Sequence, residues 1–323
     1  MKKASSTEQA LAAIKALRDS PEAYDWKRDL APFLTHKSNH VIAAAADTVG
    51  RLEAVGLASD LADAFLELMK DPARRDPGCK ALIAIAKTLA AMDHAAPKVY
   101  FAGVRHVQME GSFGPPVDAA APLRGLCAQG LARMSHPEAV LECVTLLVDS
   151  EVAARSGAVR ALGDTGKMEA LLLLRFKALV GDEDDEIMGE CFGALLRLSA
   201  AQSLEFVAGF LDSAEDAVAE RAALALGESR VAAAFPLLRE ALEHAARPAM
   251  RRTLLLGIAM LRLDEGVEFL LTRVAEEPEK SAADALAALA LYARDETLRG
   301  RIEEIVTRRK SPALRTVFTS EFR

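Results

Sequence analysis

A short alanine-rich segment recurs along most of this chain, and its regular spacing is the feature that most constrains the fold. The segments read VIAAAADTVGRL (41–52), CKALIAIAKTLAAM (79–92), PLRGLCAQGLARM (122–134), AARSGAVRALGDTG (153–166), IMGECFGALLRLS (187–199), VAERAALALGES (218–229), MRRTLLLGIAMLR (250–262) and AADALAALALYAR (282–294). Their equivalent positions are Gly50, Ala90, Ala132, Gly163, Leu196, Gly227, Met260 and Tyr292, separated by 40, 42, 31, 33, 31, 33 and 32 residues. A period near 32 residues sustained over five intervals is typical of a helical repeat array.

The composition fits a fold made only of helices. Hydrophobic residues make up 51% of the chain but aromatic residues only 5%, so alanine, leucine and valine must build the core. Alanine and leucine favour helices, whereas aromatic side chains favour strands. Each repeat therefore reads as helix, turn, helix, and such a pair buries its apolar face only by stacking on its neighbours. We predict an all-α protein, an α-solenoid or superhelix of about eight to nine helical hairpins.

The segments AARSGAVRALGDTG and VAERAALALGES resemble HEAT repeats, in particular the short bacterial kind and those of phycobilisome-lyase-like proteins. The resemblance covers about residues 40–323. It implies a stack with a concave inner side. HEAT-like arrays serve as scaffolds, adaptors, chromophore lyases and DNA glycosylases, so the resemblance alone carries no activity.

Both ends of the array are expected to be capped, within one solenoid that covers residues 1–323. Residues 1–38 form the N-terminal capping helices, where Trp26 closes the open end of the core because terminal repeats must cap themselves. Residues 311–323 form a C-terminal capping helix. Residues 299–323 carry seven Lys and Arg against three Glu. These charges are either solvated on the cap or form a docking edge for an acidic partner.

Charge and composition limit the partners and the compartment. The net charge is −7, and residues 1–120 are neutral, with 15 basic and 15 acidic residues. A protein built to hold nucleic acid usually shows a basic balance, so a nucleic-acid partner is not expected. No apolar run approaches the roughly 20 residues that span a bilayer, and the N-terminus lacks a secretory pattern. The four scattered cysteines read as buried free thiols. These features predict a cytoplasmic protein that does not insert in a membrane.

One stretch, Tyr100–Pro122, interrupts the array and accounts for the spacing of 42 residues. We predict that one helix ends near Arg105 and the next begins near Asp118, with an enlarged loop at residues 106–117 between them. This connection is longer than is usual between paired helices, and long connections in compact arrays often carry function. Because it contains Met109, Phe113 and Val117, we expect the loop to pack onto the helices.

Polar side chains gather in the same stretch. If residues 105–110 are extended, His106, Gln108 and Glu110 share one face of the strand. Such a set could bind a polar ligand or a peptide backbone, or support acid–base chemistry. Alternatively, His106 and Glu110 only tie the loop to the flanking helices by hydrogen bonds. A metal site is disfavoured because no second histidine lies nearby in the sequence.

Basic residues on the alanine-rich helices are further candidates. Arg124, Arg155 and Lys87 fall on successive helices of this kind, which in HEAT-like stacks line the concave side. They form either a small basic strip facing the loop or pairs with acids of the next repeat. Further along, Arg247 and Arg251 share a helix face. Pairing with acidic residues, for example Glu220 or Glu243, is the simplest interpretation, and phosphate or acidic-peptide binding is the alternative.

No phosphate loop, nucleophile elbow or HExxH motif occurs, so no catalytic, cofactor or metal residue is assigned. We predict a non-enzymatic scaffold that binds a protein or peptide through the concave face and the Tyr100–Pro122 insert. The predicted binding residues are Arg105, His106, Gln108, Glu110, Phe113, Asp118, Arg124 and Arg155. The alternative is an enzyme on the same fold, either chromophore-lyase-like or DNA-glycosylase-like. The latter requires a basic concave face, which the net charge does not favour.

Overall fold

A computed structural model describes residues 6–20, 22, 25–111 and 114–322. Contacts along the chain define two compact units, Met1–Leu173 and Leu174–Arg323. Nineteen α-helices and one pair of two-residue strands occur among the described residues. The chain is therefore an all-α solenoid, as the repeat period predicts.

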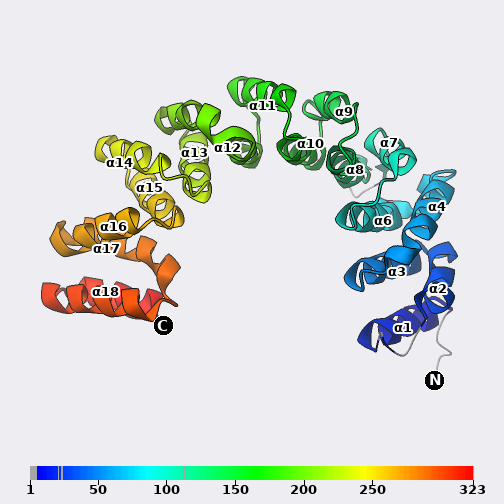
Figure 1. The fold of residues 1–323 in the computed structure, drawn as a ribbon, viewed down its shortest axis with the longest axis horizontal. Helices are drawn as coiled ribbons and strands as arrows, with labels where there is room; N and C mark the ends of the chain where they lie inside the picture. Colours follow the sequence, from blue (N-terminus) through cyan, green and yellow to red (C-terminus); the bar gives the residue numbers. More distant parts are fainter. Residues whose placement is uncertain (1–5, 21, 23–24, 112–113, 323) are drawn as a thin grey trace. The chain divides into compact units, whose positions relative to one another are not determined.

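The first unit, unit 1, contains the insert. Its elements are α1 (Ser6–Asp19), α2 (Trp26–Asp29), the 3-10 helix η2 (Ala31–Thr35), α3 (Asn39–Arg51), η3 (Val55–Leu57), α4 (Ala58–Leu68), α5 (Pro72–Arg75), η4 (Pro77–Cys79), α6 (Lys80–Ala91), α7 (Pro97–Val104), β1 (Met109–Glu110), β2 (Val117–Asp118), α8 (Ala121–Arg133), α9 (Ala139–Leu146), α10 (Val152–Asp164) and the start of α11 (Met168–Val180). The alanine-rich helices α3, α6, α8 and α10 pack side by side in one layer, and α4, α7 and α9 form a second layer (Figure 1). The core lies between these layers.

The second unit, unit 2, repeats this arrangement more regularly. After the end of α11 it contains α12 (Asp185–Ala208), η5 (Gly209–Asp212), α13 (Asp216–Glu228), α14 (Ala234–His244), α15 (Pro248–Met260), α16 (Asp264–Glu276), α17 (Glu279–Leu289), η6 (Ala290–Tyr292), α18 (Glu296–Arg309) and α19 (Pro312–Glu321). Helices α12, α13, α15 and α17 pack in one row, and α19 packs against α17 and α18. Leu314 and Phe322 anchor this last helix in the core.

Glycines explain how closely the alanine-rich helices approach one another. A Cβ atom on Gly157 of α10 would lie 2.1 Å from the Cα of Gly125 on α8. In unit 2, a Cβ on Gly227 of α13 would lie 2.5 Å from the carbonyl oxygen of Gly257 on α15. At these crossings the two backbones touch, so even the methyl group of alanine has no room.

Helix α12 combines two helices of one repeat. Its backbone is broken at Ser199, where φ is −160° and ψ is 92°. By length and composition alone, Asp185–Asp212 is the one helical segment in the described ranges that could cross a bilayer, with a hydropathy of 1.2. This differs from the expectation that no run approaches that length. The break at Ser199 divides the segment into two helices, and α12 packs against α13 and η5.

The single tryptophan is half-buried, and the four cysteines are buried. Trp26 begins α2 and is half-buried. Cys79, Cys127, Cys143 and Cys191 are free and buried, which confirms the predicted buried thiols. Burial raises the pKa of the Cys79, Cys143 and Cys191 thiols to about 12 and raises that of Cys127 as well. Such thiols are poor nucleophiles because the thiolate is the reactive form.

Candidate functional site: a hydrogen-bonded β-hairpin

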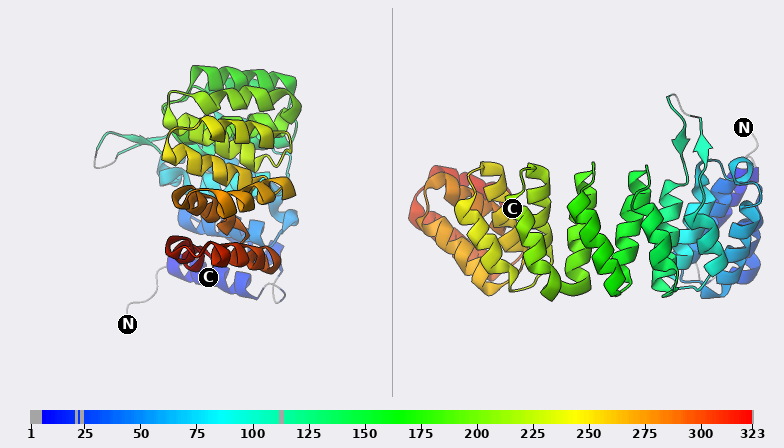
Figure 2. Two further views of the ribbon diagram at one scale, coloured as in Figure 1. Left: turned by 90° about the vertical axis from the view of Figure 1, so that its left-hand side faces the viewer. Right: turned by 90° about the horizontal axis from the view of Figure 1, so that it is seen from above.

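The connection between α7 and α8, residues 105–120, is a β-hairpin that extends away from the helices of unit 1 (Figure 2). Its strands are antiparallel, with Met109 opposite Asp118 and Glu110 opposite Val117. Helix α7 ends at Val104, close to the predicted end, whereas α8 begins at Ala121, later than predicted. We refer to residues 105–120 as the β-hairpin.

The row of His106, Gln108 and Glu110 faces inward, toward the turn that precedes α6. The Gln108 Nε2 donates to the carbonyl oxygen of Asp76 at 3.1 Å and to Glu110 Oε1 at 2.6 Å. The His106 Nε2 lies 3.1 Å from Gln108 Oε1. The Gly78 amide donates to Glu110 Oε1 at 2.7 Å. The three side chains therefore share a face, as the alternation predicts, and they tie the β-hairpin to the protein.

These bonds also stabilise the charged form of Glu110. The hydrogen bond from the Gly78 amide, followed by that from Gln108, holds the pKa of the Glu110 carboxyl below its ordinary value. A carboxylate that accepts two hydrogen bonds is favoured over its protonated form. The turn before α6 and the β-hairpin are therefore joined by a carboxylate that stays ionised at neutral pH.

Asp118 closes the base of the β-hairpin. Its Oδ1 accepts hydrogen bonds from the amides of Gln108 and Ala120, each at 3.0 Å. Its Oδ2 accepts one from Arg124 Nη1 at 2.6 Å. Burial raises the pKa of Asp118, but the hydrogen bonds from Gln108, Arg124 and Ala120 outweigh this effect and leave the pKa below its ordinary value. Asp118 thus joins both strands to the start of α8.

Arg124 is the centre of this network. Its side chain is 4% exposed, and its Nε and Nη2 donate to the two carboxylate oxygens of Asp149, each at 2.9 Å. Its Nη1 donates to the His106 carbonyl oxygen at 2.9 Å as well as to Asp118. Burial lowers the pKa of Arg124, but the hydrogen bonds to Asp149 and Asp118 outweigh it and raise the pKa above its ordinary value.

Of the two interpretations of Arg124, Arg155 and Lys87, the structure shows acid pairing for Arg124, with Asp118 and Asp149, rather than a basic strip. Arg124 and Arg155 are both buried, and Arg155 Nη1 donates to the carbonyl oxygens of Asp149 and Ser150. Lys87 is exposed on α6. A buried guanidinium persists only where its hydrogen bonds are satisfied, so these two arginines serve packing of the repeats.

Two acidic residues of this network were not predicted to belong to the site. They are Asp76, which precedes α6, and Asp149, which precedes α10. Asp76 is buried and accepts hydrogen bonds from Asn39 Nδ2 at 2.9 Å and from the amides of Ala81 at 3.0 Å and Leu82 at 2.8 Å. Asp149 accepts from the Glu151 amide at 2.9 Å. A signal was present, because an aspartate precedes each of these alanine-rich helices by a few residues.

Apolar side chains of the β-hairpin are exposed on both of its faces, because Val107 and Met109 alternate with Gln108 and Glu110, whereas Val117 lies opposite Glu110 and shares its face. Val107 and Met109 are each 58% exposed and Val117 is 55% exposed. The expectation that Met109 and Val117 pack down is therefore wrong, and Phe113 lies outside the described residues. Arg105, the C-cap residue of α7, forms a salt bridge with Glu142 of α9. Its guanidinium carbon lies 5.6 Å from the ring centre of the neighbouring Phe101.

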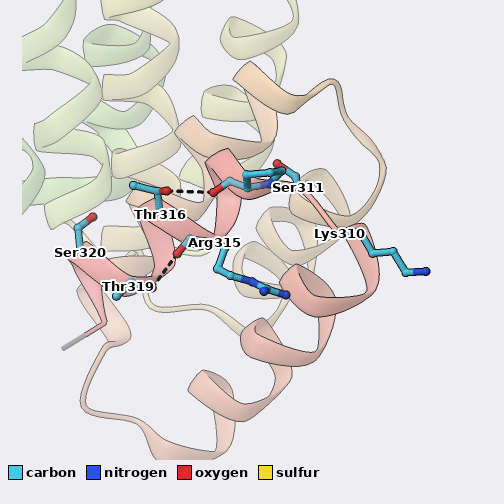
Figure 3. A pocket seen from close by; sticks show the side chains of 7 residues that line it. Lys310, Ser311, Arg315, Thr316, Thr319 and Ser320 are labelled. Carbon is cyan, nitrogen blue, oxygen red and sulfur yellow. Dashed lines mark hydrogen bonds between the residues drawn. The ribbon is translucent and has the colours of Figure 1, made fainter.

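Away from the β-hairpin, a hollow lies on helix α19 (Figure 3). This cavity of about 720 Å³ is lined by Lys310, Ser311, Pro312, Arg315, Thr316, Thr319 and Ser320. The Thr316 and Thr319 hydroxyls donate to the carbonyl oxygens of Pro312 and Arg315 in the same helix, at 3.0 and 2.8 Å. Most of the side chains that line this hollow are therefore polar. Arg309 in the basic tail donates to the carbonyl oxygens of Ala275 and Glu277, at 2.7 and 2.8 Å.

The arginines at the start of α15 have partners other than those predicted. Arg247 forms a salt bridge with Asp216, not with Glu220 or Glu243. Arg251 Nη1 donates to the carbonyl oxygens of Leu242 and Ala245, each at 3.3 Å. These contacts fasten α15 to the preceding repeat. Acid pairing is thus confirmed for Arg247, with Asp216 as its partner, whereas Arg251 bonds to backbone carbonyl oxygens.

Fold and site together define the class of this protein: an α-solenoid of HEAT-like helical hairpins with one β-hairpin inserted between repeats. No family model matches the chain, and no curated protein matches it. Among solved structures, it is similar to the complex of CpcE and CpcF of phycocyanin lyase from Nostoc sp. PCC7120, with 15% identity and a TM-score of 0.40. That match covers 79% of this chain and 94% of the other.

A second similar structure is human deoxyhypusine hydroxylase in complex with glycerol, with 19% identity and a TM-score of 0.34. It covers 84% of this chain and 98% of the other. At these identities and TM-scores, the two matches support no conclusion about this chain.

Proposed function

We propose that this protein is a non-enzymatic scaffold that binds another protein or a peptide through the β-hairpin and the adjoining helices. The observation that carries the proposal is a projecting segment that is fixed by hydrogen bonds and yet exposes apolar side chains. Gln108, Glu110 and Asp118 hold it to the protein, whereas Val107, Met109 and Val117 are more than half exposed. Exposed apolar side chains grouped on a projecting element are typical of interaction sites.

The predicted binding residues take two roles in this proposal. Arg105 contacts the partner together with Val107, Met109 and Val117. His106, Gln108, Glu110, Asp118, Arg124 and Arg155 position the β-hairpin, since their hydrogen bonds are made within the protein. A fixed segment loses little conformational entropy on binding, so this network would favour affinity. Phe113 remains a candidate contact.

The layer of alanine-rich helices supplies the rest of the proposed surface. The enzyme alternatives, a chromophore-lyase-like or DNA-glycosylase-like activity, would draw on polar or basic groups facing this layer. Arg124 and Arg155, which were the strongest basic candidates, are buried and bonded inside the protein. This observation supports the scaffold over those alternatives.

Site-specific photo-cross-linking in the cells that produce this protein tests the proposal. The photoreactive residue p-benzoylphenylalanine replaces Met109 in one strain and Val55 in a matched control strain. Val55 is 61% exposed in unit 1 but lies on η3. We expect a discrete cross-linked protein at position 109 that is absent at position 55. No adduct at position 109, or the same adducts at both positions, would overturn the proposal.

A further inference from the structure

The backbone of β1 presents polar groups to two different sides. In a strand, the N–H and C=O groups of successive residues point alternately to its two edges. The Gln108 carbonyl oxygen accepts a hydrogen bond from the Ala119 amide at 2.9 Å, so Gln108 turns its backbone groups toward β2. The backbone groups of Val107 and Met109, its neighbours in the chain, therefore point away from β2. We call this side the outer edge of β1.

The backbone groups on the outer edge of β1 have no partner. Within the described residues, no hydrogen bond joins the N–H or C=O group of Val107, Met109 or Gly111 to another residue. A Cβ placed on Gly111, the next residue on this edge, would have no neighbour within 4 Å. All three residues are exposed, and the β-hairpin extends away from the helices of unit 1 (Figure 2). Another chain can therefore reach these donors and acceptors.

The outer edge of β2 differs from that of β1. Val117 lies opposite Glu110 and turns its backbone groups toward β1, so Pro116 belongs to the outer edge of β2. Proline has no N–H group, and Pro116 therefore offers no donor to a further strand. Prolines at such positions are a common protection of sheet edges against pairing with other chains. The sequence thus blocks one edge of the β-hairpin and leaves the other able to pair.

The side chains beside the open edge favour an apolar neighbour. Val107 and Met109 are each 58% exposed, and they lie on the same face of the strand. A strand paired with β1 would place its alternate side chains about 5 Å from these two, measured between Cβ atoms. Aromatic and β-branched side chains gain most from such cross-strand contacts.

From these observations we infer that β1 binds an extended segment of another protein, which pairs with its outer edge as an additional strand. Hydrogen bonds to the backbone of Val107 and Met109 hold the segment, and its aromatic or β-branched side chains cover the side chains of the same two residues. In this mode of recognition, backbone hydrogen bonds give affinity and alternate side chains give specificity. The inference rests on the proposed function and names the form and chemistry of its partner.

The size of the edge favours a peptide segment over a second copy of this chain. Residues 107–111 span roughly 16 Å when extended, whereas a stable interface buries about 800 Å² on each partner. An antiparallel pair of β1 strands would also bring the helices of both copies to one face of the shared sheet, because Gln108 and Glu110 bond to the turn before α6 on that face. A single extended segment needs only the edge.

Selection from a displayed library of random peptides on the wild-type protein tests the inference. We expect enriched peptides in which aromatic or β-branched residues alternate with others. Their binding, measured by fluorescence polarisation, should weaken about tenfold or more with Met109→Pro, which removes the outward N–H group. The matched control Met109→Leu keeps that group and an apolar side chain of similar volume, so its binding should stay within about twofold of wild type.

Amide hydrogen exchange followed by NMR needs no substitution and therefore does not depend on the folding of Met109→Pro. A hydrogen-bonded amide exchanges only when its bond opens. The enriched peptide should slow exchange of the Val107 and Met109 amides of the wild-type protein about tenfold or more. Exchange at Gly166, an exposed residue outside the β-hairpin, should not change.

The other outcomes separate the inference from the proposed function. Peptides that bind the β-hairpin but tolerate Met109→Pro and leave exchange at Val107 and Met109 unchanged would overturn the inference, while the β-hairpin remained a binding site through its side chains. Failure to enrich any peptide that binds the β-hairpin would also overturn the inference, and no adduct at position 109 would then overturn the proposed function as well. A wild-type dimer in analytical ultracentrifugation that Met109→Pro abolishes would assign the edge to a second copy and overturn the inference.

Discussion

Two neighbouring connections in unit 1 perform the same structural task with very different lengths. The short turn between α9 and α10 supplies Asp149, and the β-hairpin between α7 and α8 supplies Asp118. Each carboxylate accepts an amide hydrogen bond near the start of the next helix, and both bind the same guanidinium, that of Arg124. In both connections, an acid that pairs with Arg124 is therefore sufficient to join the connection to the start of the next helix. The additional residues of the β-hairpin are not required for that task.

Replacing Arg124 should weaken both connections at once and cause the largest loss in the free energy of unfolding. Arg124→Ala leaves Asp118 and Asp149 without their shared cation, and breaking a buried ion pair in this way costs about 3–5 kcal/mol. Urea unfolding followed by circular dichroism measures the loss. The control Arg105→Ala removes a salt bridge from an arginine whose side chain is 64% exposed. Exposed pairs contribute about 1 kcal/mol or less. Equal losses in the two variants would show that the connections do not depend on Arg124.

Helices α8 and α10, which follow the two connections, meet at glycines. Disrupting this contact should cause the next largest loss of stability. Gly157→Ala places a methyl group 2.1 Å from the Gly125 Cα, so α8 and α10 must move apart. Overpacking of this kind costs about 1–3 kcal/mol. In the control Gly56→Ala, the new Cβ has no neighbour within 4 Å. Thermal unfolding that is unchanged in Gly157→Ala would contradict the close contact.

The repeat period predicted the helical solenoid because stacking leaves few other ways to bury alanine-rich faces. Alternation likewise predicted that His106, Gln108 and Glu110 share a face. Alternation alone does not say which face is inward, because that depends on Asp76 and Gly78 far earlier in the chain. The exposure of Met109 could not be predicted for the same reason.

The burial of Arg124 is a second property that could not be predicted from the sequence. This burial depends on two acids that come from different connections, residues 118 and 149, and meet at one guanidinium. The sequence places each acid before a helix, but their convergence on one arginine follows from the packing of α8 against α10. Sequence reasoning could therefore identify the insert and most of its polar residues, but not which of them face solvent.

Acid should weaken the β-hairpin connection through Asp118. The pKa of this carboxyl is lowered in the folded protein from an ordinary value of 3.8, so its contribution is complete above that value. The contribution is lost as the pH falls through the lower folded pKa. At neutral pH we expect Asp118→Asn to be less stable than wild type by about 1.5–3 kcal/mol, because it weakens the hydrogen bond between two charged groups, Arg124 and Asp118. The difference should shrink below pH 3.8.

Urea unfolding at a series of pH values checks this sign. The surface variant Val55→Ser changes no titratable group, so its difference from wild type should stay constant across the series. A difference between Asp118→Asn and wild type that grew on acidification would mean that the folded protein prefers the protonated carboxyl, contrary to the hydrogen bonds from Gln108, Ala120 and Arg124.

The smallest effect on stability is expected where the effect on binding should be greatest. Val107→Ser/Met109→Ser/Val117→Ser changes side chains that are already more than half exposed, so the free energy of unfolding should stay within about 0.5 kcal/mol of wild type. The contrasting variant Val159→Ser alters a valine of α10 that is 0% exposed and should cost about 1–3 kcal/mol. Urea unfolding of both variants compares an exposed apolar group with a buried one in the same unit. If the triple variant loses as much as Val159→Ser, the apolar residues of the β-hairpin belong to the core. The β-hairpin would then be a structural connection like the turn before α10, and the reason to propose a docking surface there would be gone.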